Sequence, residues 1–129
     1  ISWHVLEVLK KKGALKGKSR SVWQGMIYVA KDAQKTDGYQ ANRNLVLSDQ
    51  ARADSIPGLE ILADDVRCTH GATVGKLEQE ALFYLKSRGI PQAEAEKIVV
   101  EGFFDPIFQR IPFEGVRERF QQYIADKMS

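Results

Sequence analysis

Residues 64–75 read DDVRCTHGATVG, and they divide the chain into two parts with different hydrophobic patterns. Before this stretch, apolar residues come in short runs separated by Gly, Asp, Asn and Ser, as is typical of β-strands. After it, apolar residues recur every three or four positions, which indicates helices. The sequence therefore predicts a mostly β chain with α-helices, divided into a β part over residues 1–75 and a helical part over residues 76–129.

The β part leaves two arrangements of its strands open. Its apolar runs lie at residues 5–9, 22–29, 45–47, 59–62 and 66–70. The starts of the first four runs are roughly 14 to 23 residues apart, a spacing that fits a sandwich of hairpins and also the turns of a solenoid. The Gly-rich residues 71–75 are expected to turn the chain from the last strand into the first helix, with Thr73 as a helix cap.

The helical part predicts three helices. The first carries its apolar face from Leu77 to Leu85, and Gly89 followed by Pro91 is a stop signal. The second is expected to begin at residue 92 and to end before Pro106, and the third to begin at about residue 114.

Composition excludes several classes of protein. The chain has 129 residues, 43% apolar and 28% charged, which excludes a disordered chain. Its longest apolar run, residues 26–30, is far short of the ~20 residues of a membrane span. The net charge of +2 is too small to predict a nucleic-acid partner. The basic residues 10–20 carry few aromatic side chains, so we predict a solvated hairpin there.

Cys68 and His70 are the first candidate site residues. On an extended strand, residues two apart point to the same face, about 6.5–7 Å apart. A thiolate and an imidazole suit iron, zinc or copper(I). A closed zinc or iron–sulfur site normally has four ligands, but the chain has no second cysteine and its other histidine, His4, is distant in sequence. A metal site here would therefore need ligands from another chain.

Two other interpretations of this pair remain open. In the first, Cys68 is a small buried core residue and His70 a hydrogen-bonded strand residue. In the second, His70 activates Cys68 as a nucleophile, although neighbours on one strand face seldom reach hydrogen-bond distance. The single cysteine excludes an internal disulfide framework and suggests a reducing compartment. Motifs for a P-loop, a dinucleotide fingerprint and covalent haem attachment are not found.

Several short stretches occur together in one known family and in the same order. They are QKTD (34–37), NRNL (42–45), LSD (47–49), ARADSIP (51–57), LEI (59–61), ADDV (63–66), CTHGAT (68–73), LFYL (82–85) and SRG (87–89). Over residues 19–104 the chain resembles the C-terminal part of the SufB/SufD family of iron–sulfur cluster assembly scaffold proteins, so we expect it to be part of a longer protein.

Within this family, the glycine that follows the Cys-x-His, Gly71, resembles SufD members. SufB members tend to carry acidic residues around this histidine, where this chain has Thr69 and Gly71. A SufB-type scaffold stays open as the alternative.

The resemblance implies the last rungs of a right-handed parallel β-helix, followed by a small helical domain. It implies a non-enzymatic scaffold subunit of the SUF system that pairs with a SufB-like subunit and a SufC-like ATPase in the cytoplasm, or in the plastid stroma of a eukaryote. The rival activity is a β-helix enzyme with Cys68 as nucleophile.

The resemblance also assigns expected roles to individual residues. His70, and less strongly Cys68, are candidate ligands of a transient iron or iron–sulfur cluster at the subunit interface, shared with the partner. No cofactor is expected in the isolated chain. Phe103 and Phe104 are candidate ATPase contacts. The open end of a truncated β-helix exposes unpaired backbone, so the isolated fragment is expected to form a homodimer.

Overall fold

A computed structural model describes residues 6–129, with side chains from residue 8 onward. The chain divides into two compact units, one ending at Lys76 and one beginning at Leu77. Within the described residues, strands form the first unit and helices form the second, so the fold is mixed β and α. His4, the second histidine of the sequence, lies outside the described residues.

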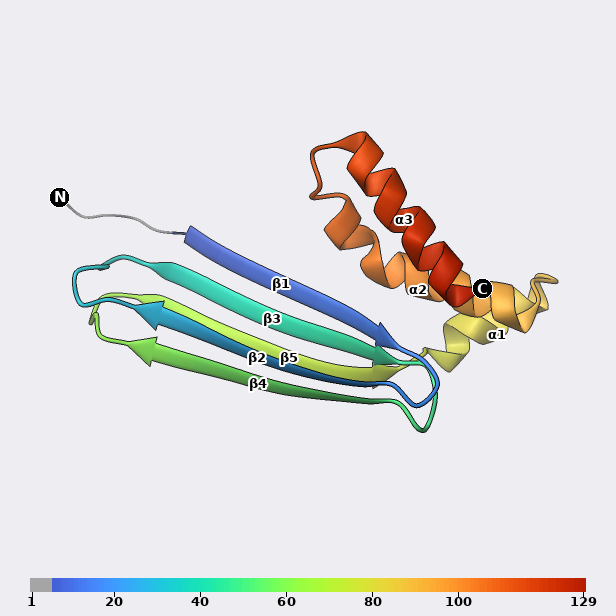
Figure 1. Cartoon of the computed structure of the whole chain (residues 1–129), viewed down its shortest axis with the longest axis horizontal. Coiled ribbons are helices and arrows are strands. Elements are labelled where there is room, and N and C mark those ends of the chain that lie inside the picture. The colour runs from blue at the N-terminus through green and yellow to red at the C-terminus, as the bar shows by residue number, and fades with distance from the viewer. Residues whose placement is uncertain (1–5) are drawn as a thin grey trace. The chain divides into compact units, whose positions relative to one another are not determined.

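The strands of the first unit alternate between two parallel sheets. They are β1 (Leu6–Leu15), β2 (Arg20–Val29), β3 (Asp37–Val46), β4 (Arg52–Ile61) and β5 (Arg67–Lys76). One sheet has the order β1-β3-β5 and the other pairs β2 with β4. Successive strands never pair with each other, so each strand lies beside the strand two places along the chain (Figure 1). Neither sheet closes into a barrel within residues 6–129.

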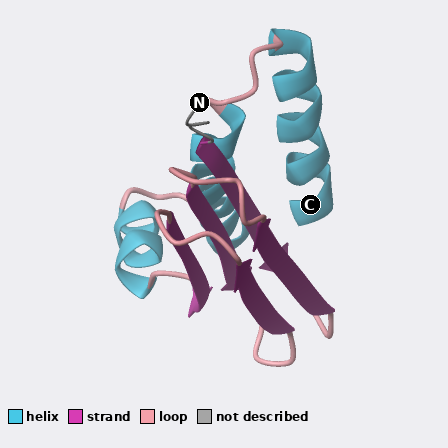
Figure 2. Ribbon diagram, turned by 90° about the vertical axis from the view of Figure 1, so that its left-hand side faces the viewer, coloured by secondary structure: helices cyan, strands magenta, loops and turns pink. Residues whose placement is uncertain are grey.

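The register joins residues about 30 positions apart in sequence. Leu6 pairs with Asp37, Asp37 pairs with Arg67, and Arg20 pairs with Arg52. Figure 2 shows these strands, in magenta, after a turn that views them toward their ends. In a hairpin, consecutive strands pair with each other and run antiparallel. Here consecutive strands do not pair and every pair is parallel, so the sandwich of hairpins is excluded. The hairpin expected at residues 10–20 is also wrong, because β1 and β2 belong to different sheets.

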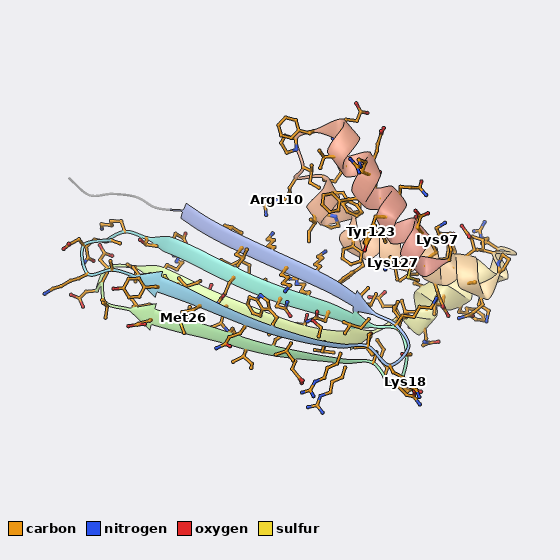
Figure 3. The ribbon with its side chains drawn as sticks, in the orientation of Figure 1. Lys18, Met26, Lys97, Arg110, Tyr123 and Lys127 are labelled. Carbon is orange, nitrogen blue, oxygen red and sulfur yellow. The ribbon has the colours of Figure 1, made fainter. Side chains whose placement is uncertain are left out.

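The side chains of β2 alternate between the space separating the two sheets and the outer face. On β2 the inward residues include Trp23 and Val29, both buried, whereas Val22 and Met26 are more than half exposed on the opposite face. Met26 is labelled in Figure 3, where it projects from β2. Period-2 alternation is the rule for strands with one buried face. The core of this unit therefore lies between the sheets.

The turn predicted at residues 71–75 is not formed. Strand β5 runs through this segment to Lys76, and its pairing with β3 continues through Gly75 opposite Leu45. Among the described glycines only Gly17 and Gly89 have positive φ, so the backbone at Gly71 and Gly75 is one that a strand accepts. A Gly-rich stretch here marks a lightly packed strand, not a turn.

The second unit contains three helices, α1 (Gln79–Ser87), α2 (Gln92–Phe108) and α3 (Glu114–Met128). Helix α1 ends as the sequence predicts. Gly89, at φ +86°, donates its N–H to the carbonyl of Lys86, and the N–H of Ile90 bonds to the carbonyl of Leu85. These two bonds are the Schellman arrangement, in which glycine supplies the left-handed residue that satisfies the last carbonyls.

Helix α2 continues past the expected stop. Pro106 lies inside it, near the C-terminal end, and the helix ends at Phe108, which is 5% exposed. The ring of Phe104 stacks with that of Phe108 at a centroid distance of 6.2 Å. We attribute the continuation of the last turn to this apolar packing, which offsets the hydrogen bond that proline cannot donate. No helix within residues 6–129 has the length and apolar character needed to cross a membrane.

Gly25 is the position in the core where a side chain fits least. A Cβ built there would lie 2.6 Å from Cη2 of Trp23 and 2.6 Å from Oε1 of Gln40, both in buried side chains. We predict that Gly25→Ala lowers the free energy of unfolding by about 1–3 kcal/mol, the usual cost of overpacking. Urea denaturation followed by Trp fluorescence measures the change.

Gly75→Ala is the matched control, because a Cβ at Gly75 meets nothing within 4 Å. The urea concentration at which this variant is half unfolded should be no lower than that of the unsubstituted chain. Equal midpoints for both variants would show that the packing around Trp23 is looser than the structure has it.

Candidate functional site

Cys68 and His70 lie on β5, at the end of the three-stranded sheet. Both occupy the face that points toward the second sheet, because they are in register with Gly38 and Gln40 on the inward face of β3. The second sheet has only β2 and β4, so no further strand of residues 6–129 lies opposite β5. His70 is therefore exposed and Cys68 is half-buried, although both side chains are on an inward face.

Gly38 makes room for the sulfur of Cys68. A Cβ at residue 38 would lie 3.3 Å from Sγ of Cys68 and 3.7 Å from Cγ2 of Ile27. The thiol therefore packs over the bare backbone of β3 on one side, whereas its other side remains accessible. The interpretation of Cys68 as a fully buried core residue does not fit this half exposure.

The pair offers two donor atoms and no complete site. Within the described residues, no three His, Cys, Asp or Glu side chains gather as a metal site would require. Cys68 and His70 also lie on the exposed sheet edge where a neighbouring chain can reach them. One nitrogen and one sulfur from this chain would need further ligands from elsewhere to hold iron.

A buried polar ladder, which the sequence pattern did not indicate, lies one strand away from this pair. On β3, Gln40 is 1% exposed, Asn42 0% and Asn44 6%. The Nδ2 of Asn44 donates to Oδ1 of Asn42, and Oγ of Ser55 on β4 donates to the same oxygen at 2.5 Å. The Nε2 of Gln40 donates to the carbonyl of Gly58, also on β4, at 3.0 Å. These bonds tie the two sheets together across the core.

The signal for this ladder is present in the sequence but is easily misread. Gln40, Asn42 and Asn44 are polar residues at alternate positions, a pattern that normally marks the solvent face of a strand. The structure turns this face inward. Only the pairing of β3 with β5 and its packing against β4 reveal that the three amides are buried.

The candidate ATPase contacts, Phe103 and Phe104, are half-buried on α2. Their rings meet edge to face, with centroids 5.1 Å apart and an interplanar angle of 75°. The most exposed apolar side chains of this unit lie elsewhere. They are Phe83 and Tyr84 on α1, Phe113 before α3, and Val116, Phe120 and Tyr123 on α3. Figure 3 labels Tyr123 and, one turn further along α3, Lys127, whose Nζ lies 5.6 Å from the Tyr123 ring centroid.

The charged groups whose pKa values are shifted, Asp54 and Lys12, lie on other strands than Cys68 and His70. Hydrogen bonds from Arg52 and Arg20 hold the pKa of Asp54 below its usual value. Asp54 thus separates two guanidinium groups that the register places side by side. Burial, and then the positive charges of Arg43 and Lys10, lower the pKa of Lys12.

Comparison with known proteins identifies the family. The family model for "SUF system FeS cluster assembly, SufBD core domain" matches residues 8–103, which include both strands of the ladder and the Cys68–His70 pair. The chain belongs to the SufBD family. The description of this family names iron–sulfur cluster assembly by the SUF system, the family that the sequence resemblance had indicated.

Individual relatives agree with this assignment. The iron-sulfur cluster assembly protein SufD of Escherichia coli is 40% identical over 117 residues, covering 91% of this chain and 28% of the relative. SufD of Bacillus subtilis is 39% identical over 118 residues, covering 92% and 27%. A SufBD family protein of Mycobacterium tuberculosis is 44% identical over 125 residues, covering 91% and 32%. The chain thus spans about a third or less of the length of these relatives.

The half exposure of Cys68 predicts its reactivity. We expect one thiol per chain to react with iodoacetamide under native conditions, more slowly than in the unfolded chain, because the backbone of Gly38 lies against one side of the sulfur. Mass spectrometry of the time course measures both rates. Labelling that requires denaturant would mean that Cys68 is a sealed core residue.

Proposed function

We propose that this chain is the C-terminal part of a SufD-like, non-enzymatic scaffold subunit of the SUF system. In this proposal its two parallel sheets are the last rungs of a right-handed parallel β-helix. The subunit pairs with a SufB-like protein and acts with a SufC-like ATPase in the cytoplasm. The alternation of strands between two parallel sheets and the SufD relatives support it.

His70 is the proposed ligand for the iron or cluster that is assembled. The observation that carries this role is the exposure of His70 on the inward face of β5, the end strand of its sheet. A metal bound there can take one nitrogen from this chain and complete its shell from a partner subunit that covers the strand. Cys68, two residues away on the same face and less exposed, is the second candidate ligand.

The His70→Ala variant tests this role. We predict that it leaves the fold intact, since the side chain of His70 is exposed, and that it lowers cluster formation by the assembled complex at least several-fold. Circular dichroism checks the fold, and the cluster absorbance of reconstituted complex measures yield.

Thr69→Ala is the control for this substitution. Thr69 lies between the two candidate ligands on the opposite strand face, so the control should keep full cluster yield. Full yield from His70→Ala would remove His70 from the mechanism.

Reconstitution with this chain in place of either subunit separates the SufD from the SufB interpretation. Turnover by the isolated chain that thiol alkylation abolishes would favour the Cys68 enzyme instead.

The helical unit is the proposed contact for the ATPase, with Phe103 and Phe104 as candidate residues. Both rings are half-buried, so leucine is the better test substitution because it keeps most of the apolar volume. We predict that the Phe103→Leu/Phe104→Leu variant binds the ATPase several-fold more weakly in a calorimetric titration.

Phe83→Leu, on α1, is the matched control and should bind as the unsubstituted chain does. The side chain of Phe83 is 76% exposed, so this variant changes a surface aromatic without disturbing the core. If the double variant keeps its affinity and Phe83→Leu loses it, the docking surface lies on α1 and the assignment of Phe103 and Phe104 is wrong.

A further inference from the structure

Two atoms of the buried polar ladder have no hydrogen-bond partner among the described residues. They are Oε1 of Gln40, an acceptor, and Nδ2 of Asn42, a donor. Both belong to side chains that are at least 99% buried. Buried amide groups in native proteins nearly always have a partner, either in the protein or in an ordered water molecule. These two atoms therefore point to a small ligand within the core.

Gln40 and Asn42 are neighbours on one face of β3. Gln40 and Asn42 are two residues apart on β3, so they point to the same face with Cα atoms about 6.5–7 Å apart. A water molecule that makes hydrogen bonds of about 2.9 Å to each of two atoms spans up to about 5.8 Å between them. The other halves of both amides are already engaged, with Gly58 on β4 for Gln40 and with Ser55 on β4 for Asn42.

We propose that the space between the sheets holds an ordered water molecule that donates to Oε1 of Gln40 and accepts from Nδ2 of Asn42. This bound water completes the ladder that links β3 to β4. It is independent of the proposed function, because it requires neither a partner subunit nor iron.

The chemistry of the surroundings selects water over other ligands. Both groups are neutral, and they present one donor and one acceptor, which a single water molecule matches. A metal cation would need several oxygen ligands, and the neighbouring inward side chains supply none that is charged: Trp23 packs at this level and Ser55 is already bonded to Asn42. Trp23 and Gln40 also fill the space over Gly25.

A high-resolution crystal structure of the full chain provides the first test. We expect electron density for one water molecule within about 3.2 Å of both Oε1 of Gln40 and Nδ2 of Asn42. In solution, cross-relaxation between the side-chain amide protons of Asn42 and a long-lived water molecule should be seen by NMR. A dry space in the crystal and no water contact at Asn42 in solution would overturn the proposal.

The Gln40→Met variant is designed to remove the proposed water site while keeping the volume of the side chain. Methionine has a similar volume but no acceptor for the water, so the density and the Asn42 cross-relaxation should both disappear. Gln24→Met, on the exposed outer face of β2, should leave both signals unchanged. Persistence of the Asn42 signal in Gln40→Met would show that the water does not bridge these two groups. If Gln40→Met fails to fold, the two measurements on the unsubstituted chain still decide.

Discussion

The parallel pairing of strands about 30 residues apart is the constraint on which the first unit depends. Because successive strands alternate between two sheets, a residue on β5 lies beside a residue on β3, not beside its neighbour in sequence. This alternation fixes which side chains share the space between the sheets. It also leaves β5 as the end strand, on whose inward face Cys68 is half-buried and His70 is exposed within residues 6–129. The position of Cys68 and His70 follows directly from this arrangement.

The core that supports this edge is partly polar, which is expensive unless its groups are paired. An unsatisfied buried amide costs about 1–3 kcal/mol, comparable to the gain from burying one aliphatic side chain. Gln40, Asn42, Asn44 and Ser55 avoid most of this cost by bonding to one another or to the β4 backbone. These bonds also fix the position of β3 along β4, the strand of the other sheet against which it packs. A slip of two residues would keep every side chain on its face but would break these bonds.

The sequence predicted the local features better than the long-range ones. The stop of α1 at Gly89 and the starts of α2 at Gln92 and α3 at Glu114 rest on nearby residues and are confirmed. The strand through residues 71–75 was missed, because glycines that mark turns in isolation are accepted in a strand paired along its length. The strand pairing itself was undecided, since the paired strands do not repeat in sequence. The shared face of Cys68 and His70 followed from the two-residue period of a strand, but their exposure depends on the position of β5 at the end of its sheet.

In the proposed function, this chain supplies one side of a metal site and another subunit supplies the rest. The most direct measurement is pulsed electron paramagnetic resonance of the assembled, iron-loaded complex, in which only this chain carries ¹⁵N-histidine and His4 is replaced by Gln. A hyperfine coupling typical of a directly bound imidazole nitrogen is the predicted result, and it must then come from His70. A spectrum without ¹⁵N coupling, from a complex that holds its iron normally, would contradict the account.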